Sequence, residues 1–74
     1  MQEVNCYHIV VTGAVEEKTF NASSPIWIIV EKIDPESTRF SISTDQSGLI
    51  GLLRFLHLRG FVLLSVSRSE TIPT

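Results

Sequence analysis

The sequence predicts a small α+β domain with a ferredoxin-like sheet, and three observations support this class. Segments rich in β-branched and aromatic residues predict four strands, near 5–15, 26–33, 38–43 and 61–67. A single stretch with helical spacing of apolar residues predicts one packing helix near 45–59. Because this helix joins the last two strands, they should run parallel through a right-handed crossover. A sheet order of 4-1-3-2 then places the first strand between them.

The first strand should direct Tyr7 and Ile9 to one face of the sheet and His8 to the other, because side chains alternate along a strand. The segment that follows, EEKTFNASSP at 16–25, is polar and closes on Ser-Ser-Pro. We expect it to form a loop with room for one helical turn. This loop would replace the first helix of a full ferredoxin-like fold, which leaves the order β-β-β-α-β.

The second and third strands should form an antiparallel hairpin. The residues between them, DPES at 34–37, suit a turn, because proline presets φ and aspartate can bond the backbone downstream. In the third strand Phe40 and Ile42 should point inward and Arg39 outward. The alternation of the third strand therefore gives the hairpin one apolar face.

The helix has a start signal and a stop signal. Thr44 or Asp45 can cap its first turn through a side-chain oxygen, and Gly60 can adopt the left-handed conformation that ends a helix. Helical spacing gathers four leucines on the face that should pack on the sheet: Leu49, Leu52, Leu53 and Leu56. Residues 68–74 are expected to form a frayed tail of this single domain.

Apolar residues should remain on the surface after one chain folds. Hydrophobic residues make up 43% of the 74 residues and charged residues only 19%, which is low for a domain with so much surface. On the helix, Phe55 and Leu58 should project outward on the same side as Gly48 and Gly51. This surplus of exposed apolar residues predicts that the surface of another protein chain covers them.

A second copy of the chain would supply that cover, so we expect a homo-oligomer, with a dimer the simplest form, or docking on a protein partner. The sheet contribution follows from alternation: if Val62, Leu64 and Val66 face the helix, their neighbours Phe61 and Leu63 face away. In strand two, only one of Trp27 and Ile28 can face inward. The expected interface residues are therefore Trp27, Ile28, Phe55, Leu58, Phe61 and Leu63.

Charge is unevenly distributed along the chain. Residues 1–38 hold two lysines against six acids, which gives −4, and residues 39–74 hold four arginines against two acids, which gives +2. The difference is either chance in a small sample or complementarity between surfaces that meet in an oligomer. The total of −2 disfavours nucleic acid as a partner.

Several functional classes are disfavoured by the residues present. Cys6 has no second cysteine to pair with, and Cys6 with His8 gives too few ligands for a metal, so we expect no metal and no cofactor. No nucleophile, acid–base or phosphate-binding motif is present, which predicts a protein that is not an enzyme. No apolar run reaches the ~20 residues that span a bilayer. Because the first residues also lack the basic region of a signal peptide, we expect a cytoplasmic protein without a membrane partner.

The stretch at 45–68, DQSGLIGLLRFLHLRGFVLLSVSR, resembles the first β-α-β unit of ACT domains. The matching positions are an acid, glycines and the apolar and serine residues that follow: Asp45, Gly48, Leu49, Ile50, Leu56, Gly60, Leu64, Ser65 and Val66. Ser47 stands where that family usually has proline. The resemblance implies a regulatory ferredoxin-like module that pairs into dimers and binds a small metabolite, such as an amino acid, at the glycine turn. The stretch is also similar to the C-terminal part of short bacterial proteins of unknown function.

The resemblance places a candidate ligand site at the start of the helix, at Asp45, Gln46, Ser47, Gly48 and Gly51. Backbone N–H groups at a helix N-terminus attract anions, although Asp45 is itself negative. The alternative is that Asp45 only caps the helix. Two functions therefore stay open: a small non-catalytic assembly module that acts as a homo-oligomer or docked subunit, and an ACT-like regulatory domain that binds a metabolite.

Overall fold

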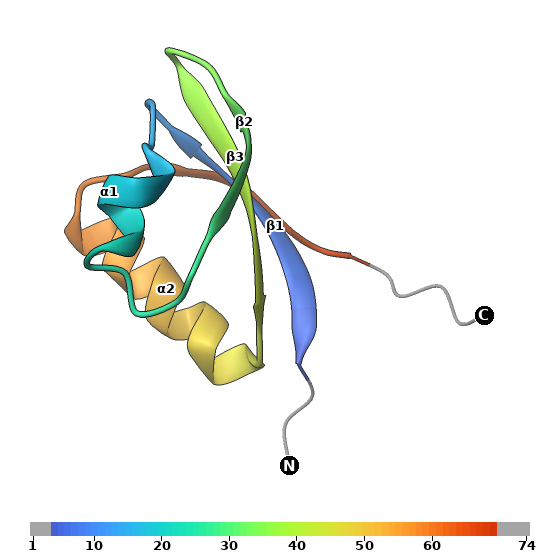
Figure 1. Ribbon diagram of the computed structural model, residues 1–74. Helices are drawn as coiled ribbons and strands as arrows, with labels where there is room; N and C mark the ends of the chain where they lie inside the picture. The colour runs from blue at the N-terminus through green and yellow to red at the C-terminus, as the bar shows by residue number, and fades with distance from the viewer. Residues whose placement is uncertain (1–3, 70–74) are drawn as a thin grey trace.

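Residues 4–69 are described by the computed structural model, and they form six elements (Figure 1). In chain order these are β1 (Asn5–Thr12), α1 (Glu17–Asn21), β2 (Ile29–Ile33), β3 (Ser37–Thr44), α2 (Gln46–Leu58) and β4 (Leu63–Arg68). The four predicted strands and the long helix are confirmed, each within three residues of its predicted bounds. Of the tail predicted to fray, Arg68 instead closes β4, and residues 70–74 lie outside the described residues.

The segment at 16–25, predicted as a loop with room for one helical turn, contains the five-residue helix α1. The element order is therefore β-α-β-β-α-β, the order of ferredoxin-like folds. Asn21, the last residue of α1, fixes the chain that leads to β2. Its side-chain amide donates to the carbonyl of Ile28 at 3.0 Å and accepts from the N–H of Ile28 at 2.8 Å. The Asn21 side chain thus bonds both backbone groups of Ile28, as a neighbouring strand would, and this orders the polar segment between α1 and β2.

The sheet has the order β2-β3-β1-β4, and every neighbouring pair is antiparallel. This is the predicted order, with β1 between β3 and β4, and it is compatible with a ferredoxin-like sheet. Since β3 and β4 both run antiparallel to β1, they are parallel to each other, as the crossover through α2 requires. Both helices lie on one side of the sheet (Figure 1).

The core lies between the sheet and the two helices. The predicted inward residues are confirmed, because Ile9 and Phe40 are fully buried and Ile42 and Tyr7 nearly so. From α2, Leu52 and Leu56 are buried against them, with Leu49 and Leu53 packed at the margin. Each fully buried side chain of this size contributes about 1.5–3 kcal/mol through the hydrophobic effect.

Both ends of α2 match the sequence signals. The Asp45 carboxylate accepts the N–H of Gly48 at 2.8 Å, which confirms Asp45 and not Thr44 as the N-cap. At the other end Gly60 has a φ of +84°. The Gly60 N–H donates to the His57 carbonyl and the Phe61 N–H to the Leu56 carbonyl, both at 3.0 Å, which is the pattern of a Schellman motif.

Candidate interaction surface

The residues predicted to form an interface divide into three groups in the structure. Trp27, Leu58 and Leu63 have exposed fractions of 68%, 77% and 44%, so they are available to another chain. Ile28 is fully buried inside this chain and cannot contact a partner, whereas Trp27 faces outward; both residues precede β2, which begins at Ile29. The other two predicted residues, Phe55 and Phe61, are half-buried.

Phe55 and Phe61 do not lie on the open side predicted for them, because α1 packs beside both rings, and their place in an interface stays a prediction. Phe20 of α1 lies with its ring centroid 5.4 Å from that of Phe55 and 6.2 Å from that of Phe61, both with their rings steeply inclined to each other. Such edge-to-face pairs are a favourable arrangement of aromatic rings. Helical spacing puts Phe55 on a side of α2 that would be open if α2 were the only helix. Because α1 packs on that side, Phe55 is half-buried. Phe61, predicted to face away from the helix, packs on the helical side of the sheet.

The faces of β4 are set by a β-bulge that the sequence pattern does not reveal. Val66 lies opposite Ile9 of β1, and Ser65 lies opposite Val10. The next residue of β1, Val11, then pairs with Leu63, so Leu64 has no partner in β1. Because paired residues share a face, Val66 and Leu63 both lie on the helical side. The prediction for Val66 is confirmed, and the prediction that Leu63 points to the opposite face is wrong.

Little of this chain covers the helical side of β4. Every residue of β4 is exposed, and the exposed fractions include 58% for the preceding Val62, 54% for Leu64 and 37% for Val66. A groove of about 340 Å³ runs between this strand and α2, and it is lined by Leu53, Leu56, His57, Phe61, Val62 and Leu63. Leu58, the last residue of α2, is largely in solvent but does not line this groove. Part of the apolar surplus predicted from composition therefore lies at β4 and the end of α2, and another part lies at Trp27, Ile29 and Ile33, in and before β2.

β4 is also an edge strand of the sheet that residues 4–69 form, with β1 as its neighbour on one side. The Ser69 N–H donates to the Cys6 carbonyl at 2.8 Å, which fixes the alternation of backbone groups. In an antiparallel pair the N–H and C=O of every second residue point to the same neighbour. Those of Ser67 and Ser65 consequently face β1, and those of Val66 and Arg68 face away from it, toward the open edge.

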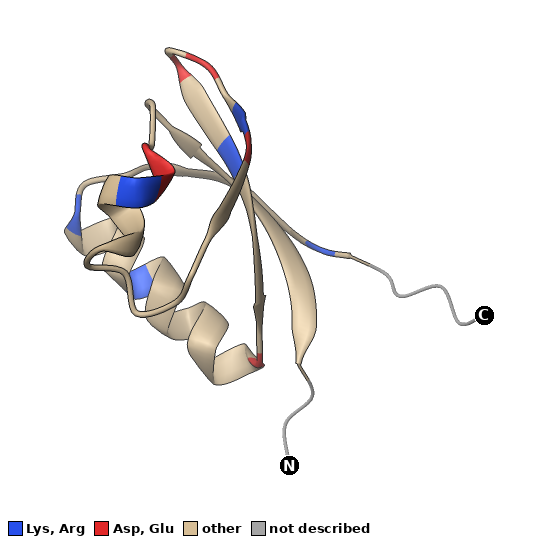
Figure 2. Cartoon of the chain, in the orientation of Figure 1, with Lys and Arg blue, Asp and Glu red and all other residues tan. Residues whose placement is uncertain are grey.

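The opposite edge, β2, has a different character. Its central residues are Glu31 and Lys32, a β-bulge occurs at Glu31, and Pro35 follows in the turn. Charges, bulges and proline are features that protect an edge strand from pairing with another chain. The stretch from Val62 to Ser67 contains no charged residue and no proline. Figure 2 shows the contrast, with charges gathered along β2 and its turn and a single basic position at the far end of β4.

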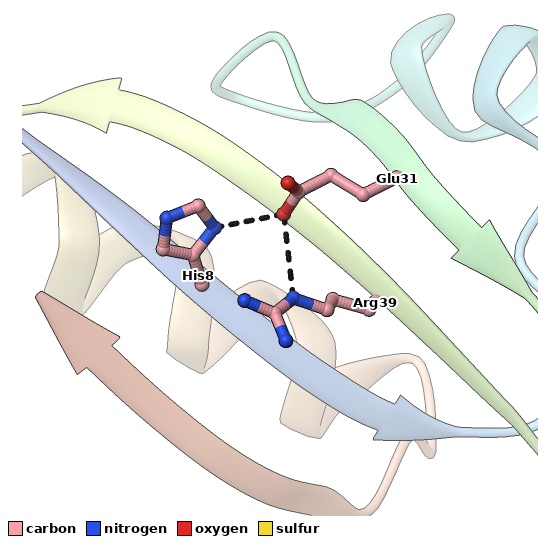
Figure 3. A network of polar contacts seen from close by, with 3 residues as sticks. All are labelled: His8, Glu31 and Arg39. Carbon is pink, nitrogen blue, oxygen red and sulfur yellow. Dashed lines mark hydrogen bonds and ion pairs between the residues drawn. The ribbon is translucent and has the colours of Figure 1, made fainter. Parts of the chain in front are cut away.

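The open face of the sheet is mostly polar, with Ile29 as an exposed apolar residue, which corrects the expectation of a bare apolar face. Its centre is a contact between three strands: His8 Nδ1 lies 2.7 Å from Glu31 Oε1, and Arg39 Nε lies 3.6 Å from the same oxygen (Figure 3). The hydrogen bond from His8 lowers the pKa of Glu31, with a smaller contribution from the nearby charges of His8 and Arg39. Serines occupy the register positions around this cluster: Ser41, Ser43, Ser65 and Ser67.

At the predicted ligand turn the structure shows a capped helix. The Gly48 N–H is taken by the Asp45 carboxylate, so this donor is already used within the chain. Gly48 is not on an open face as predicted, because a side chain there would meet Thr44 and Ile26. Gly51 is exposed with open space around its Cα, as predicted. Gln46 and Ser47 lie in the first turn of α2. Ligand binding at these residues stays a prediction.

Other site types can be addressed for the part of the chain that the structure describes. Between residues 4 and 69, no three His, Cys, Asp or Glu side chains gather as a metal site would need. No helix within the same range is both long enough and apolar enough to cross a membrane. The chain matches no protein-family model, no curated protein and no solved structure. The ACT-like resemblance therefore stays a prediction as well.

Proposed function

We propose that this protein is a small non-catalytic assembly module that forms a homodimer through β4. The observation that carries the proposal is the difference between the two edges of the sheet. Both edge strands contain a bulge and expose apolar side chains, Ile29 and Ile33 on β2 and Leu63, Leu64 and Val66 on β4. Only β2 also has the central charges Glu31 and Lys32 and a proline turn, whereas β4 has no charge before Arg68. An unprotected apolar edge is a template for pairing with another strand.

A second copy is the partner that fits this edge best. Two β4 strands related by a two-fold axis would pair antiparallel, and the outward N–H and C=O groups of Val66 and Arg68 would bond across the axis. The same symmetry would bring the two grooves together, so that Val62 and Leu63 leave solvent on both chains. A chain of 74 residues buries only about 60% of its unfolded surface alone, so this added burial would be a substantial part of its stability.

The cellular setting that we propose is the cytoplasm. Cys6 is exposed and unpaired in the structure. Exposed free thiols persist in a reducing compartment, where disulfides are rare.

The test separates backbone pairing from side-chain burial at one position. Val66→Pro removes an N–H that points to the open edge, while the hydrogen bonds from Ser65 and Ser67 to β1 remain. Val66→Ala shortens the same side chain but keeps the N–H, so it is the matched control. Sedimentation equilibrium should show a dimer for the parent and for Val66→Ala, and a folded monomer for Val66→Pro.

Thermal unfolding gives a second measurement. The melting temperature of the parent should rise with protein concentration, because association stabilises only the folded chain. Val66→Pro should melt at a temperature independent of concentration. A parent that sediments as a folded monomer at micromolar concentration would overturn the homodimer and leave a different protein as the partner of β4.

A further inference from the structure

A pocket of about 340 Å³ lies away from β4, between α1 and the C-terminal end of α2. Its floor is aromatic, because the rings of Phe20, Phe55 and Phe61 meet there. Phe20 is 8% exposed and is held from below by Phe40, with ring centroids 6.1 Å apart. The floor is therefore a supported apolar surface, and its volume is at the small end of pockets that hold organic ligands.

One cation stands at the rim of this pocket. Arg59 lies with its Cζ 5.0 Å from the ring centroid of Phe55, and its Nη2 donates to Ser23 Oγ at 3.0 Å. These two contacts hold the guanidinium beside the aromatic floor. Arg59 forms no ion pair with an acid among residues 4–69. A guanidinium has five N–H donors in a planar fork that matches a carboxylate, and one contact to a hydroxyl leaves donors for a ligand.

A second charge limits what the pocket can accept. Glu16 also lines it, and its Oε1 accepts from Thr19 Oγ1 at 2.9 Å. With one acid and one base at the rim, a multiply charged anion such as a phosphate ester would be repelled as well as attracted. A ligand with a single negative charge and an apolar body suits both the rim and the floor.

We propose that this pocket binds a small aromatic monocarboxylate. Its ring would pack on the Phe20, Phe55 and Phe61 cluster, and its carboxylate would accept hydrogen bonds from Arg59. Three independent features support this class of ligand: the aromatic floor, the volume, and a fixed arginine without an acidic partner in the described chain. The site does not depend on the proposed dimer, because β4 does not line it.

The test is a titration of ¹⁵N-labelled protein with phenylacetate, followed by amide chemical shifts. Phenylacetate should shift the amides of α1 and of the end of α2, with saturation in the range up to ~10 mM that is typical of a ligand with few atoms. Phenylacetamide, which has the same shape without the charge, should bind at least about tenfold more weakly, because it offers Arg59 one neutral acceptor oxygen in place of two carboxylate oxygens. Equal binding of the two compounds would overturn the role given to Arg59.

Matched variants of two arginines test whether the carboxylate of phenylacetate binds at Arg59. Arg59→Gln should weaken phenylacetate binding about tenfold or more, and Arg59→Lys should lie between this variant and the parent, because lysine keeps the charge without the fork. Arg54→Gln removes an exposed arginine of the same helix that does not line the pocket, and it should bind like the parent. Shifts outside the pocket, or equal weakening by Arg54→Gln, would overturn the proposal.

The monomeric variant Val66→Pro separates this inference from the proposed assembly. It should bind phenylacetate with the affinity of the parent, since its pocket residues are unchanged. Loss of binding in a folded Val66→Pro chain would show that the pocket requires the dimer and would overturn the independent site. A parent that is monomeric yet binds phenylacetate at the pocket would remove the proposed assembly and leave the pocket assignment intact.

Discussion

Two glycines within α2 should respond with opposite sign to the same change, Gly→Ala. Gly51 is exposed, and a Cβ added there has no heavy atom within 4 Å. Alanine in an exposed helix interior is more favourable than glycine by about 0.8–1 kcal/mol, mainly because glycine loses more backbone entropy on folding. Gly51→Ala should therefore raise the free energy of unfolding by roughly that amount.

Replacing Gly48 by alanine would bring the same gain in helix propensity, but the structure has no space there for the added methyl group. An added Cβ would overlap Thr44 Oγ1 and lie 2.9 Å from Ile26 Cδ1 and 3.2 Å from Thr44 Cβ. Thr44 must then rotate or the start of α2 must move away from β3, and overpacking of this kind costs about 1–3 kcal/mol. Gly48→Ala should consequently be less stable than Gly51→Ala by about 1–3 kcal/mol.

Urea unfolding followed by far-ultraviolet circular dichroism measures the difference. All variants must be compared at one protein concentration, because association adds to the apparent stability. With a urea dependence of about 1–3 kcal/mol per molar for a small domain, the two alanine variants should differ in midpoint by around 1 M. Equal midpoints would show that Gly48 does not pack tightly on Thr44 and Ile26, and would refute the reasoning.

Three further outcomes test the turn, the link to β2 and the polar face. Gly60→Val places a β-branched residue at a φ of +84° and should lower the free energy of unfolding by about 1–2 kcal/mol or more; an unchanged urea midpoint would mean that α2 ends differently. Asn21→Ala removes both hydrogen bonds to Ile28 and should cost about 1–3 kcal/mol in the same assay, with Asn21→Asp, which keeps only the acceptor, between alanine and the parent. Glu31→Gln tests pH dependence. Because the pKa of Glu31 is lowered in the folded chain, the carboxylate stabilises the fold above its ordinary pKa near 4.5, and this contribution is lost as the pH falls through the lower folded value. The difference between parent and Glu31→Gln should be at most about 1 kcal/mol near pH 7 and vanish in acid; a difference that grows in acid would contradict the assignment.

The predictions that held were those carried by local signals. The limits of α2 follow from Asp45 and Gly60, whose capping roles need only neighbouring backbone groups. The inward directions of Ile9 and Phe40 follow from alternation, which a regular strand preserves. The sheet order followed from these elements because a right-handed crossover leaves few ways to connect them.

The predictions that failed depended on contacts between distant segments. α1 has five residues, too few to be stable alone, so its helix depends on Phe20 packing against α2 and the sheet. The sequence pattern does not place a helix beside Phe55 and Phe61, so it predicts that both side chains face outward. The bulge at Leu64 then reversed the expected face of Leu63, because one extra residue changes the alternation of a strand.

The candidate sites were less accessible to sequence reasoning than the fold. Composition indicated an apolar surplus, and Leu58 and Trp27 were correctly expected on the surface. The sequence did not show that β4 would be the unprotected edge, although the absence of charge from Val62 to Ser67 was a usable signal. The pocket beneath Arg59 left no such signal, because Ser23 and Arg59 are 36 residues apart in the chain.

The sequence by itself therefore determined the strands, the long helix, its two ends and the sheet order, since each depends on periodicity or on a residue whose own conformational preference is strong. Only the tertiary structure decided which apolar residues are covered, which edge of the sheet is open, and where Arg59 meets the aromatic cluster. The physical reason is that local backbone preferences act over a few neighbouring residues, whereas burial depends on which distant segments pack together. In a chain this short, a single added helix turn or one bulged residue changes that packing.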